Sequence, residues 1–354
     1  MIRSSEVHVH KVTINDIANA AGVSVGTVSK VLNGDQTVKE RNRLAVQNAI
    51  QTLGYNVNQA ARRLARGPIC LGIMLPNVFD AYFDSMEAGI LRVIRSLSDY
   101  RVSAVVRRYA KFDDDQSVSR CLSDFMENHV DGILLGPLRS IQENSPVLSL
   151  LHASRLPVVL LLSDLPQLPR LSCVSIDAVL SGQTAADLAV LSTPPDRHFT
   201  VLVGNKDVAE HRIKAESFQK RIAEYGRHAV RVLETQDDPG LAYMLSCNLI
   251  RDNPNLGLIY VATGNSVAVC KAICDCGKAD SVKVIATDLP DGLMPYVDRS
   301  VILGVLDQHL DEIGSRAAFA LYQHLVDGTA CTDEISIPPS LLLRSSIKSR
   351  STGK

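Results

Sequence analysis

The sequence contains no hydrophobic stretch long enough to cross a membrane. No apolar run reaches the roughly 18 residues that a transmembrane helix needs, and the polar residues 1–11 lack the apolar core of a secretory signal. The phosphate-binding Gly-x-x-x-x-Gly-Lys-Ser/Thr loop, the His-Glu-x-x-His helix and a Gly-x-Ser-x-Gly elbow between strand and helix are also missing. We therefore expect a cytoplasmic protein that is not an enzyme and has neither a cofactor nor a membrane partner.

The eight cysteines show no metal-binding pattern. Cys270, Cys274 and Cys276 are the one cluster, but their spacing lacks the second half of a zinc site and no His lies at a matching offset. In the cytosol we expect thiols buried in helical packing, neither paired in disulfides nor bound to a metal.

Charge is distributed unevenly along the 354 residues. The first 67 residues carry nine Lys or Arg and four acids, whereas the remainder carries 28 and 34. A small basic region on a mildly acidic body suits a protein in which one part binds phosphates and another binds something else. With 46% hydrophobic residues and this length, we expect two or three folded units.

The basic region has the apolar spacing of a helix-turn-helix followed by a third helix. Thr13 begins a capping box, and Gly22 ends the first helix. Ser24 caps a second helix, and a third covers about residues 40–53. In such a unit the second helix enters the major groove of DNA. The alternative is an ordinary three-helix packing unit with solvated polar positions.

The second helix presents small and polar residues outward. Small side chains near its N-terminus permit close approach to base edges, hydroxyls and the helix N-terminus bond phosphate, and Lys30 can reach guanine or a phosphate. These outward positions are Val25, Gly26, Thr27, Ser29 and Lys30.

Four stretches of this region resemble the head of the lactose-repressor (LacI/GalR) family of transcriptional regulators. They are V-T-I-N-D-I-A at 12–18, A-G-V-S at 21–24, T-V-S-K-V-L-N at 27–33 and L-G-Y at 53–55. The resemblance implies base reading by Val25, Gly26 and Lys30. It implies phosphate contacts by the hydroxyl and amide residues Thr13, Ser24, Thr27, Ser29 and Asn33.

Residues 58–67 form a short segment rich in Ala and Arg, too short for a stable isolated helix. It reads either as a basic linker or, by the family resemblance, as a hinge helix that orders on DNA. In the second case Leu64 is the minor-groove wedge, and Ala61 and Ala65 allow close contact. Two departures from the family pattern affect this region. Lys39 stands where a Ser usually caps the third helix, so Thr37 is expected to cap instead, and Val57 replaces the Pro before the hinge.

From residue 70 onward, short apolar strands alternate with helical patterns, which predicts parallel sheets covered on both faces. The expected strands lie at 70–75, 102–106, 132–135, 158–162, 201–203, 257–262 and 282–286, and the expected helices at 83–97, 116–128, 182–191, 212–225 and 266–276. This length suits two similar lobes with a ligand between them. Residues 70–347 resemble the sugar-binding module that the same family shares with periplasmic binding proteins.

By this resemblance, Arg212 followed by Phe218 corresponds to the pocket arginine and its aromatic, and Asp288 to a pocket aspartate. Arginine donates two hydrogen bonds to adjacent hydroxyls, and aspartate accepts two, as a polyol requires. The expected effector site is Asn77, Asp80, Phe83, Arg212, Asn265, Asp288 and Gln308. Each has an ordinary alternative as a surface ion pair or a capped strand end. Gly264-Asn265 replaces the Asn-Asp frequent in the family, so the effector is expected to differ from the familiar ones.

These observations predict an α plus α/β protein in which a helix-turn-helix headpiece and hinge helix precede a two-lobed, periplasmic-binding-protein-like (type I) α/β sandwich. The expected boundaries are 1–57 for the DNA-binding domain, 58–68 for the hinge, 69–347 for the effector-binding and dimerisation domain and 348–354 for a tail. The predicted function is ligand-responsive repression. A homodimer binds a roughly palindromic double-stranded operator, and a sugar, cyclitol or sugar phosphate changes its affinity. A solute-binding protein or a sugar-processing enzyme are the weaker alternatives, since the first has no use for a basic head and the second lacks its motifs.

Overall fold

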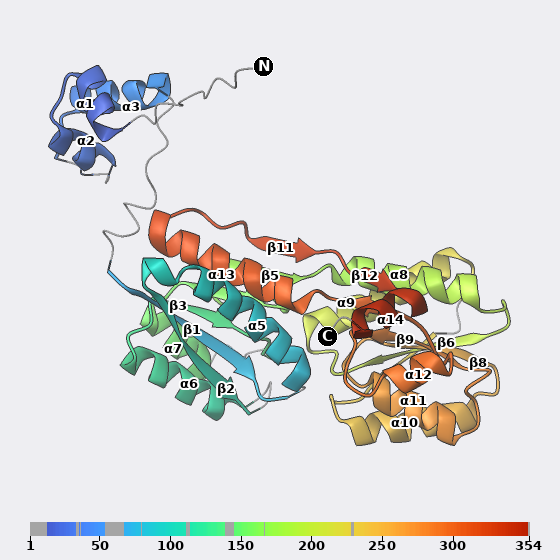
Figure 1. The fold of residues 1–354 in the computed structure, drawn as a ribbon. Helices are drawn as coiled ribbons and strands as arrows, with labels where there is room; N and C mark the ends of the chain where they lie inside the picture. The colour runs from blue at the N-terminus through green and yellow to red at the C-terminus, as the bar shows by residue number, and fades with distance from the viewer. Residues whose placement is uncertain are drawn as a thin grey trace, which may run out of the picture. The chain divides into compact units, whose positions relative to one another are not determined.

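The computed structural model describes residues 13–32, 35, 37–53, 67–78, 80–110, 114–138, 145–165, 167–227 and 230–352. The chain separates into two compact units that divide between Gly67 and Pro68 (Figure 1). Among the described residues, no helix combines the length and the apolar character that crossing a bilayer requires.

The first unit contains the predicted helix-turn-helix and third helix: α1 (Ile14–Ala21), α2 (Val25–Leu32) and α3 (Glu40–Leu53). Thr13 and Asp16 form the expected capping box on α1, and Gly22 ends this helix in the left-handed conformation with φ 64°. The three helices enclose a small core, and its buried members are Ile17, Ala18, Val28, Val46 and Ala49.

The start of α3 differs from the prediction that Thr37 caps it. The Thr37 hydroxyl and backbone N–H both donate to Asp35 Oδ1, at 2.6 and 2.8 Å. The first backbone bonds of α3 instead run from Asn42 and Arg43 to the carbonyl of Lys39. Aspartate is the stronger acceptor for a nearby hydroxyl, so the turn before α3 is fastened by Asp35.

The second unit consists of two α/β lobes, as predicted (Figure 1). The first lobe contains a six-stranded sheet with the order β11-β5-β4-β3-β1-β2. All pairs in it are parallel, and its strands are β1 (Ile69–Pro76), β2 (Val102–Tyr109), β3 (Gly132–Leu135), β4 (Val158–Leu161), β5 (Ser172–Ile176) and β11 (Glu334–Ile337). Its helices are α5 (Asp80–Ser96), η1 (Ser98–Tyr100), α6 (Asp115–Glu127), α7 (Pro146–Ser154) and α13 (Leu310–Asp327).

The second lobe repeats this arrangement with the order β12-β10-β9-β8-β6-β7, in which only the β10–β12 pair is antiparallel among the described strands. The strands are β6 (His198–Val203), β7 (Val230–Glu234), β8 (Leu256–Val261), β9 (Lys283–Thr287), β10 (Ile302–Asp307) and β12 (Ser340–Leu342). The helices are α8 (Ala178–Ser192), α9 (Ala209–Glu224), α10 (Pro239–Asp252), α11 (Ser266–Asp275), α12 (Met294–Asp298) and α14 (Arg344–Thr352).

The chain passes three times between the lobes, from β5 to α8, from β10 to α13 and from β11 to β12. The second lobe also includes residues that the sequence analysis assigned to a separate tail. Helix α14 continues to Thr352, Ile347 is buried, and Lys348 Nζ lies 2.7 Å from Asp298 Oδ1. The sequence analysis missed this helix because residues 348–354 are poor in apolar side chains. One buried side chain, that of Ile347, and the ion pair of Lys348 hold the helix in place.

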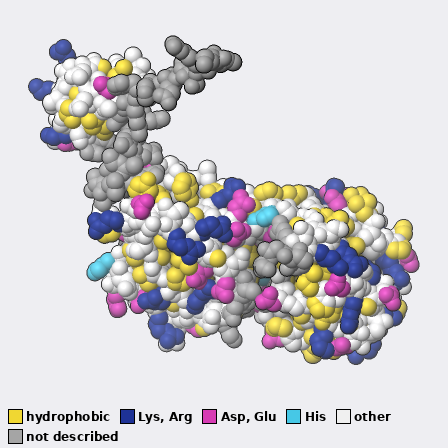
Figure 2. All heavy atoms as spheres, viewed as in Figure 1, with side chains coloured by type: hydrophobic (Ala, Val, Ile, Leu, Met, Phe, Trp, Pro, Cys, Tyr) yellow, Lys and Arg dark blue, Asp and Glu magenta, His cyan; other side chains and the backbone are white. Residues whose placement is uncertain are grey.

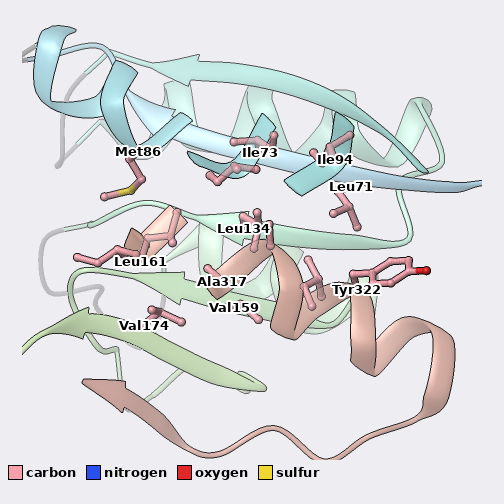
Figure 3. Packing of buried hydrophobic residues seen from close by; sticks show 14 of the residues in the cluster. Leu71, Ile73, Met86, Ile94, Leu134, Val159, Leu161, Val174, Ala317 and Tyr322 are labelled. Carbon is pink, nitrogen blue, oxygen red and sulfur yellow. The ribbon is translucent and has the colours of Figure 1, made fainter. Parts of the chain in front are cut away.

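One core of the first lobe lies between its sheet and the helix pair α5 and α13 (Figure 3), and a second includes residues of α6 and α7. Leu71, Leu134 and Val159 of the sheet face this pair. The two helices approach so closely that a Cβ on Gly89 would lie 2.0 Å from the Asp311 carbonyl oxygen. In the second lobe, Gly182 of α8 allows the same closeness to α9, where a Cβ would lie 2.4 Å from the Lys214 carbonyl oxygen. Because glycine has no Cβ, both positions allow the paired helices to come into backbone contact.

Candidate functional site

The exposed start of α2 carries the residues expected to read DNA. Val25 is 43% exposed, and Ser24, Gly26 and Lys30 are also exposed, whereas Thr27 and Ser29 are partly buried. The Ser24 hydroxyl lies 3.2 Å from the backbone nitrogen of Thr27 and therefore caps the helix. The exposed face of α2 therefore combines small side chains, which allow close approach to a base edge, with one cation that can bond to DNA.

Several residues expected at the DNA interface are engaged within the head itself. The Thr13 hydroxyl donates to Asp16 Oδ2 at 2.7 Å. The hydroxyls of Ser24 and Thr27 lie 3.0 Å apart. Asn33, Ala61, Leu64 and Ala65 lie outside the described residues, so their expected roles stay predictions. Residues 22–26 read Gly-Val-Ser-Val-Gly, the letters of a nucleophile elbow, but they join two helices and not a strand to a helix.

A cavity that is partly open to solvent lies between the two lobes at the carboxyl ends of their strands. This is where parallel α/β sheets bind ligands. The first lobe contributes Tyr82, Phe83, Pro137 and Leu162 to its lining. The second lobe and the β10–α13 crossover contribute Val208, Glu210, His211, Lys214, Asp237, Ala262, Thr263, Gly264, Thr287 and Gln308.

A buried lysine holds the polar side of the cavity. The Lys214 side chain is 2% exposed, and its ammonium donates to Glu210 Oε1 and, at 2.6 Å, to Gln308 Oε1. Lys214 lies four residues after Glu210 on α9, so both side chains occupy one face of that helix. A buried ammonium is tolerated because both partners satisfy its charge and its protons.

Gln308 connects Lys214 to both lobes. Its amide nitrogen donates to Asp288 Oδ2 at 2.7 Å and to the Tyr82 hydroxyl of the first lobe at 3.1 Å. Its backbone N–H donates to Asp288 Oδ1 at 2.8 Å. Burial raises the pKa of Asp288 to about 6, against the opposing effect of these hydrogen bonds. Burial, followed by the charge of Glu210, raises the pKa of Tyr82 well above its usual value, so its hydroxyl stays neutral.

The loops around the cavity adopt backbone conformations that favour glycine. Leu162, Asp237 and Asp288 have φ of 70°, 58° and 55°. Asp237 sits over Gly204, where a Cβ would lie 2.0 Å from its Oδ1, and it accepts a hydrogen bond from the Thr263 hydroxyl at 2.8 Å. Such conformations cost energy and persist where the surroundings fix them, as in a site that holds its donors ready for a ligand.

The structure brings some of the expected effector residues to the cavity. Phe83 and Gln308 line it, and Asp288 stands behind Gln308. Asn265 is buried beside it and donates to Thr235 Oγ1 at 3.1 Å, but it is not part of the lining. Asn77 is exposed and also outside the lining. The side chain of Asp80 lies outside the described residues.

Arg212 corrects the sequence analysis. Its side chain is 48% exposed, is not part of the lining, donates to the Lys206 carbonyl oxygen at 3.3 Å and lies 3.9 Å from Glu216 Oε1. The buried Phe218 lies six positions after Arg212, and positions six apart lie on different faces of a helix. The buried face of α9 carries Glu210, Lys214 and Phe218, which are spaced at i, i+4 and i+8. This spacing is the sequence signal that would have identified Lys214 as the cation of the cavity.

The lining contains further residues that were not among the expected site residues, including Tyr82, His211 and Asp237. Tyr82 precedes Phe83, and the two rings meet edge to face with centroids 4.9 Å apart. His211 accepts the backbone N–H of Asn205 at 3.2 Å through Nδ1. Asp237 follows β7, an edge strand that the sequence analysis did not predict. Among the described residues, no group of three or more His, Cys, Asp or Glu side chains could hold a metal ion.

A helix-turn-helix head followed by a two-lobed binding domain defines the class of DNA-binding regulators that respond to a ligand. The model for bacterial regulatory proteins of the lacI family matches residues 13–58, and the model for the periplasmic binding protein domain matches residues 71–330. The chain therefore belongs to the LacI family of transcriptional regulators, and the predicted family and fold class are confirmed.

Relatives and solved structures agree with this assignment. Catabolite control protein A of Streptococcus mutans is 37% identical over 124 residues, which is 35% of this chain and 36% of that protein. The HTH-type transcriptional regulator PtxS of Pseudomonas aeruginosa is 27% identical over 348 residues, covering 96% of this chain and 97% of that protein. A solved complex of the transcriptional regulator CelR with cellobiose has a TM-score of 0.65 at 20% identity, covering 95% of this chain and 99% of that one.

Proposed function

We propose that this regulator is a cytoplasmic, non-enzymatic repressor whose operator affinity changes when a neutral polyol, a sugar or cyclitol, binds between the lobes. The single observation that carries this proposal is the cavity whose polar wall is the Glu210–Lys214–Gln308 network. The transcriptional regulator CelR, which is similar in fold, was solved as a complex with cellobiose.

The lining matches the chemistry of a ring that carries hydroxyls. Carboxylates such as Asp237 accept hydrogen bonds from hydroxyl groups, and amides such as Gln308 both donate and accept. Tyr82 and Phe83 offer an aromatic surface for the apolar face of such a ring.

Charge favours a neutral ligand over the sugar phosphate that the sequence analysis also allowed. Glu210 and Asp237 bring two carboxylates to the lining, and its single lysine is already paired with Glu210. A phosphate needs uncommitted cations or several free backbone N–H groups, because desolvating its charge is costly.

On the DNA side, we propose that a homodimer binds a roughly palindromic operator with two heads, each covering residues 1–57. The base-reading residues are Val25, Gly26 and Lys30 on α2, which are exposed at the start and on the outer face of this helix. Residues 58–68 connect the head to the effector-binding domain, and their proposed wedge is Leu64.

Ligand control follows from the position of the cavity. A ligand that touches Phe83 of the first lobe and Asp237 of the second favours one separation of the lobes over others. The operator affinity then changes by an amount set by how strongly the ligand favours that lobe arrangement.

A thermal-shift screen of the full-length protein against sugars, cyclitols and sugar phosphates tests the ligand class, because binding to the native state raises Tm. We expect a neutral polyol to raise Tm and to change the operator affinity measured by fluorescence anisotropy. A Tm rise with sugar phosphates alone would overturn the proposed ligand class.

The proposed base reader is tested separately on duplex DNA. Lys30→Ala should weaken operator binding by about tenfold and, if Lys30 contacts a phosphate, lower the salt slope by about one. Lys39→Ala is the matched control, because Lys39 precedes α3 and not α2. Equal losses in the two variants would remove Lys30 from the proposed interface.

A further inference from the structure

A histidine joins two of the three crossovers between the lobes. His309 follows Gln308 in the β10–α13 crossover, and its Nε2 lies 2.7 Å from the hydroxyl oxygen of Ser340. Ser340 is the first residue of β12, at the second-lobe end of the β11–β12 crossover. The imidazole therefore connects two segments that are 31 positions apart in the sequence.

The backbone of His309 has a conformation that is uncommon for a residue with a Cβ. Its φ of 55° and ψ of 50° lie in the left-handed region. Its N–H donates to Asp307 Oδ1 at 3.1 Å, and its carbonyl oxygen accepts from the backbone N–H groups of Glu312 and Ile313. A conformation that costs energy persists here because bonds on both sides of the residue and on its side chain hold it.

The third crossover is stiff and is fastened at both ends. It contains two consecutive prolines at 338–339, whose rings restrict the backbone. At the first-lobe end, the Ile337 carbonyl oxygen accepts the backbone N–H of Asp177 in the first crossover, at 2.8 Å. At the second-lobe end, the hydroxyl of Ser340 meets His309 of the second crossover. The three crossovers are thus tied to one another.

We propose that His309 is a positioning residue of the effector response, and that its hydrogen bond to Ser340 holds Gln308 in place on the cavity wall. This inference rests on the proposed polyol response. Gln308 is the chain neighbour of His309, and its amide bonds Lys214 of the second lobe and Tyr82 of the first. Because hydrogen bonds need donor–acceptor distances of about 3 Å, a crossover that shifts relative to β12 loses these contacts.

The same hydrogen bond, the His309–Ser340 latch, restricts how the lobes move. Lobes that open or close turn about the segments that connect them. With the second and third crossovers tied together, the two segments turn as one hinge. Without the latch, the ligand-free domain has more conformational freedom, and a ligand must remove that freedom when it binds. Polyol affinity falls, and so does the factor by which the polyol changes operator affinity.

Ser340→Ala in the full-length protein tests the proposal, because it removes one hydroxyl and leaves the histidine in place. We expect the affinity for the polyol found by the thermal-shift screen to fall about three- to tenfold, as the loss of one neutral hydrogen bond predicts. The ratio of operator affinities with and without polyol should move toward one. Ser340→Thr keeps the hydroxyl and should restore both values. Ser336→Ala, which alters an exposed serine of β11, is the matched control.

Hydrogen exchange of the ligand-free protein examines the latch without any ligand. In Ser340→Ala, the amides of residues 307–312 should exchange about fivefold faster than in the wild type and in Ser336→Ala. An unchanged exchange rate in this segment would overturn the proposal. A lower Tm with unchanged polyol affinity would show a structural role alone and would overturn it as well.

The two proposals fail in different ways. If no polyol changes the operator affinity of the wild type, the proposed function is wrong, and the exchange experiment still decides whether the latch holds the second crossover. If the wild type responds to a polyol and Ser340→Ala responds equally, the proposed function stands and His309 is not a positioning residue.

Discussion

The two lobes share one architecture but contribute different chemistry to the cavity. Their sheets have the same central strand order, β2-β1-β3-β4-β5 in the first and β7-β6-β8-β9-β10 in the second. The first lobe contributes aromatic and aliphatic side chains, while all the charged lining residues come from the second. On the face in Figure 2, the outer surface of the binding domain mixes positive and negative side chains, so this face does not repeat the division seen in the cavity.

This difference shows that two lobes with the same fold can contribute different kinds of side chain to one cavity. The same strand ends point into the cavity in both lobes, so the loops and the first helical turns decide what each lobe offers. In the proposed complex, the second lobe would bind hydroxyl groups through α9, and the first would cover the ligand through Tyr82 and Phe83 at the start of α5. The hydrogen bond from Gln308 to the Tyr82 hydroxyl links the two sides of the cavity.

The largest test of this division removes the buried cation. Lys214→Ala leaves Glu210 without its ion-pair partner and should lower the free energy of unfolding by about 3–5 kcal/mol. It should also abolish the polyol-induced Tm shift. Denaturant unfolding measures the first effect. The double variant Glu210→Gln/Lys214→Met, which removes both charges, should recover part of the stability, and a stable single variant would contradict the network.

A pH titration examines the carboxylate behind Gln308. Because the folded pKa of Asp288 is raised to about 6 from 3.8, its contribution to stability is present below pH 4 and is lost as the pH rises to about 6. Relative to Asp288→Asn, the wild type should therefore lose up to about 3 kcal/mol of unfolding free energy across this window. If the free energies of unfolding of the two proteins changed with pH in the same way, Asp288 would not be the source of this pH dependence.

Tyr82→Phe removes the hydroxyl that links the lobes and keeps the aromatic ring. One neutral hydrogen bond contributes about 1 kcal/mol, so polyol affinity should fall about three- to tenfold. Isothermal titration measures this change. Tyr100→Phe, which alters a tyrosine of the same lobe away from the lining, is the control. Equal affinity in wild type and Tyr82→Phe would mean that the link does not contribute to binding.

The smallest expected effect is that of Arg212→Ala. This arginine is exposed and its ion pair is long, so stability should change by less than about 0.5 kcal/mol and the ligand response should persist. The variant is the helix-matched control for Lys214→Ala. Loss of the response would restore the role that the sequence analysis gave to Arg212.

The sequence by itself determined the architecture. The capping box at Thr13, the turn at Gly22 and the alternation of strands and helices are local patterns, and each produced the element expected of it. The edge strands β7, β11 and β12 escaped prediction because short, half-exposed strands lack a clear apolar pattern. Strands β5 and β10 were also missing from the expected strands, although both are largely buried.

Only the tertiary structure decided which polar groups meet in the cavity. Lys214, Gln308 and Tyr82 are far apart in the sequence, and they come together because the first turns of α9 and α5 meet the β10–α13 crossover at the cavity. Arg212 and Lys214 differ by two positions and therefore by about half a helical turn. That rotation places one cation in solvent and the other in the core, which the residue types alone cannot distinguish.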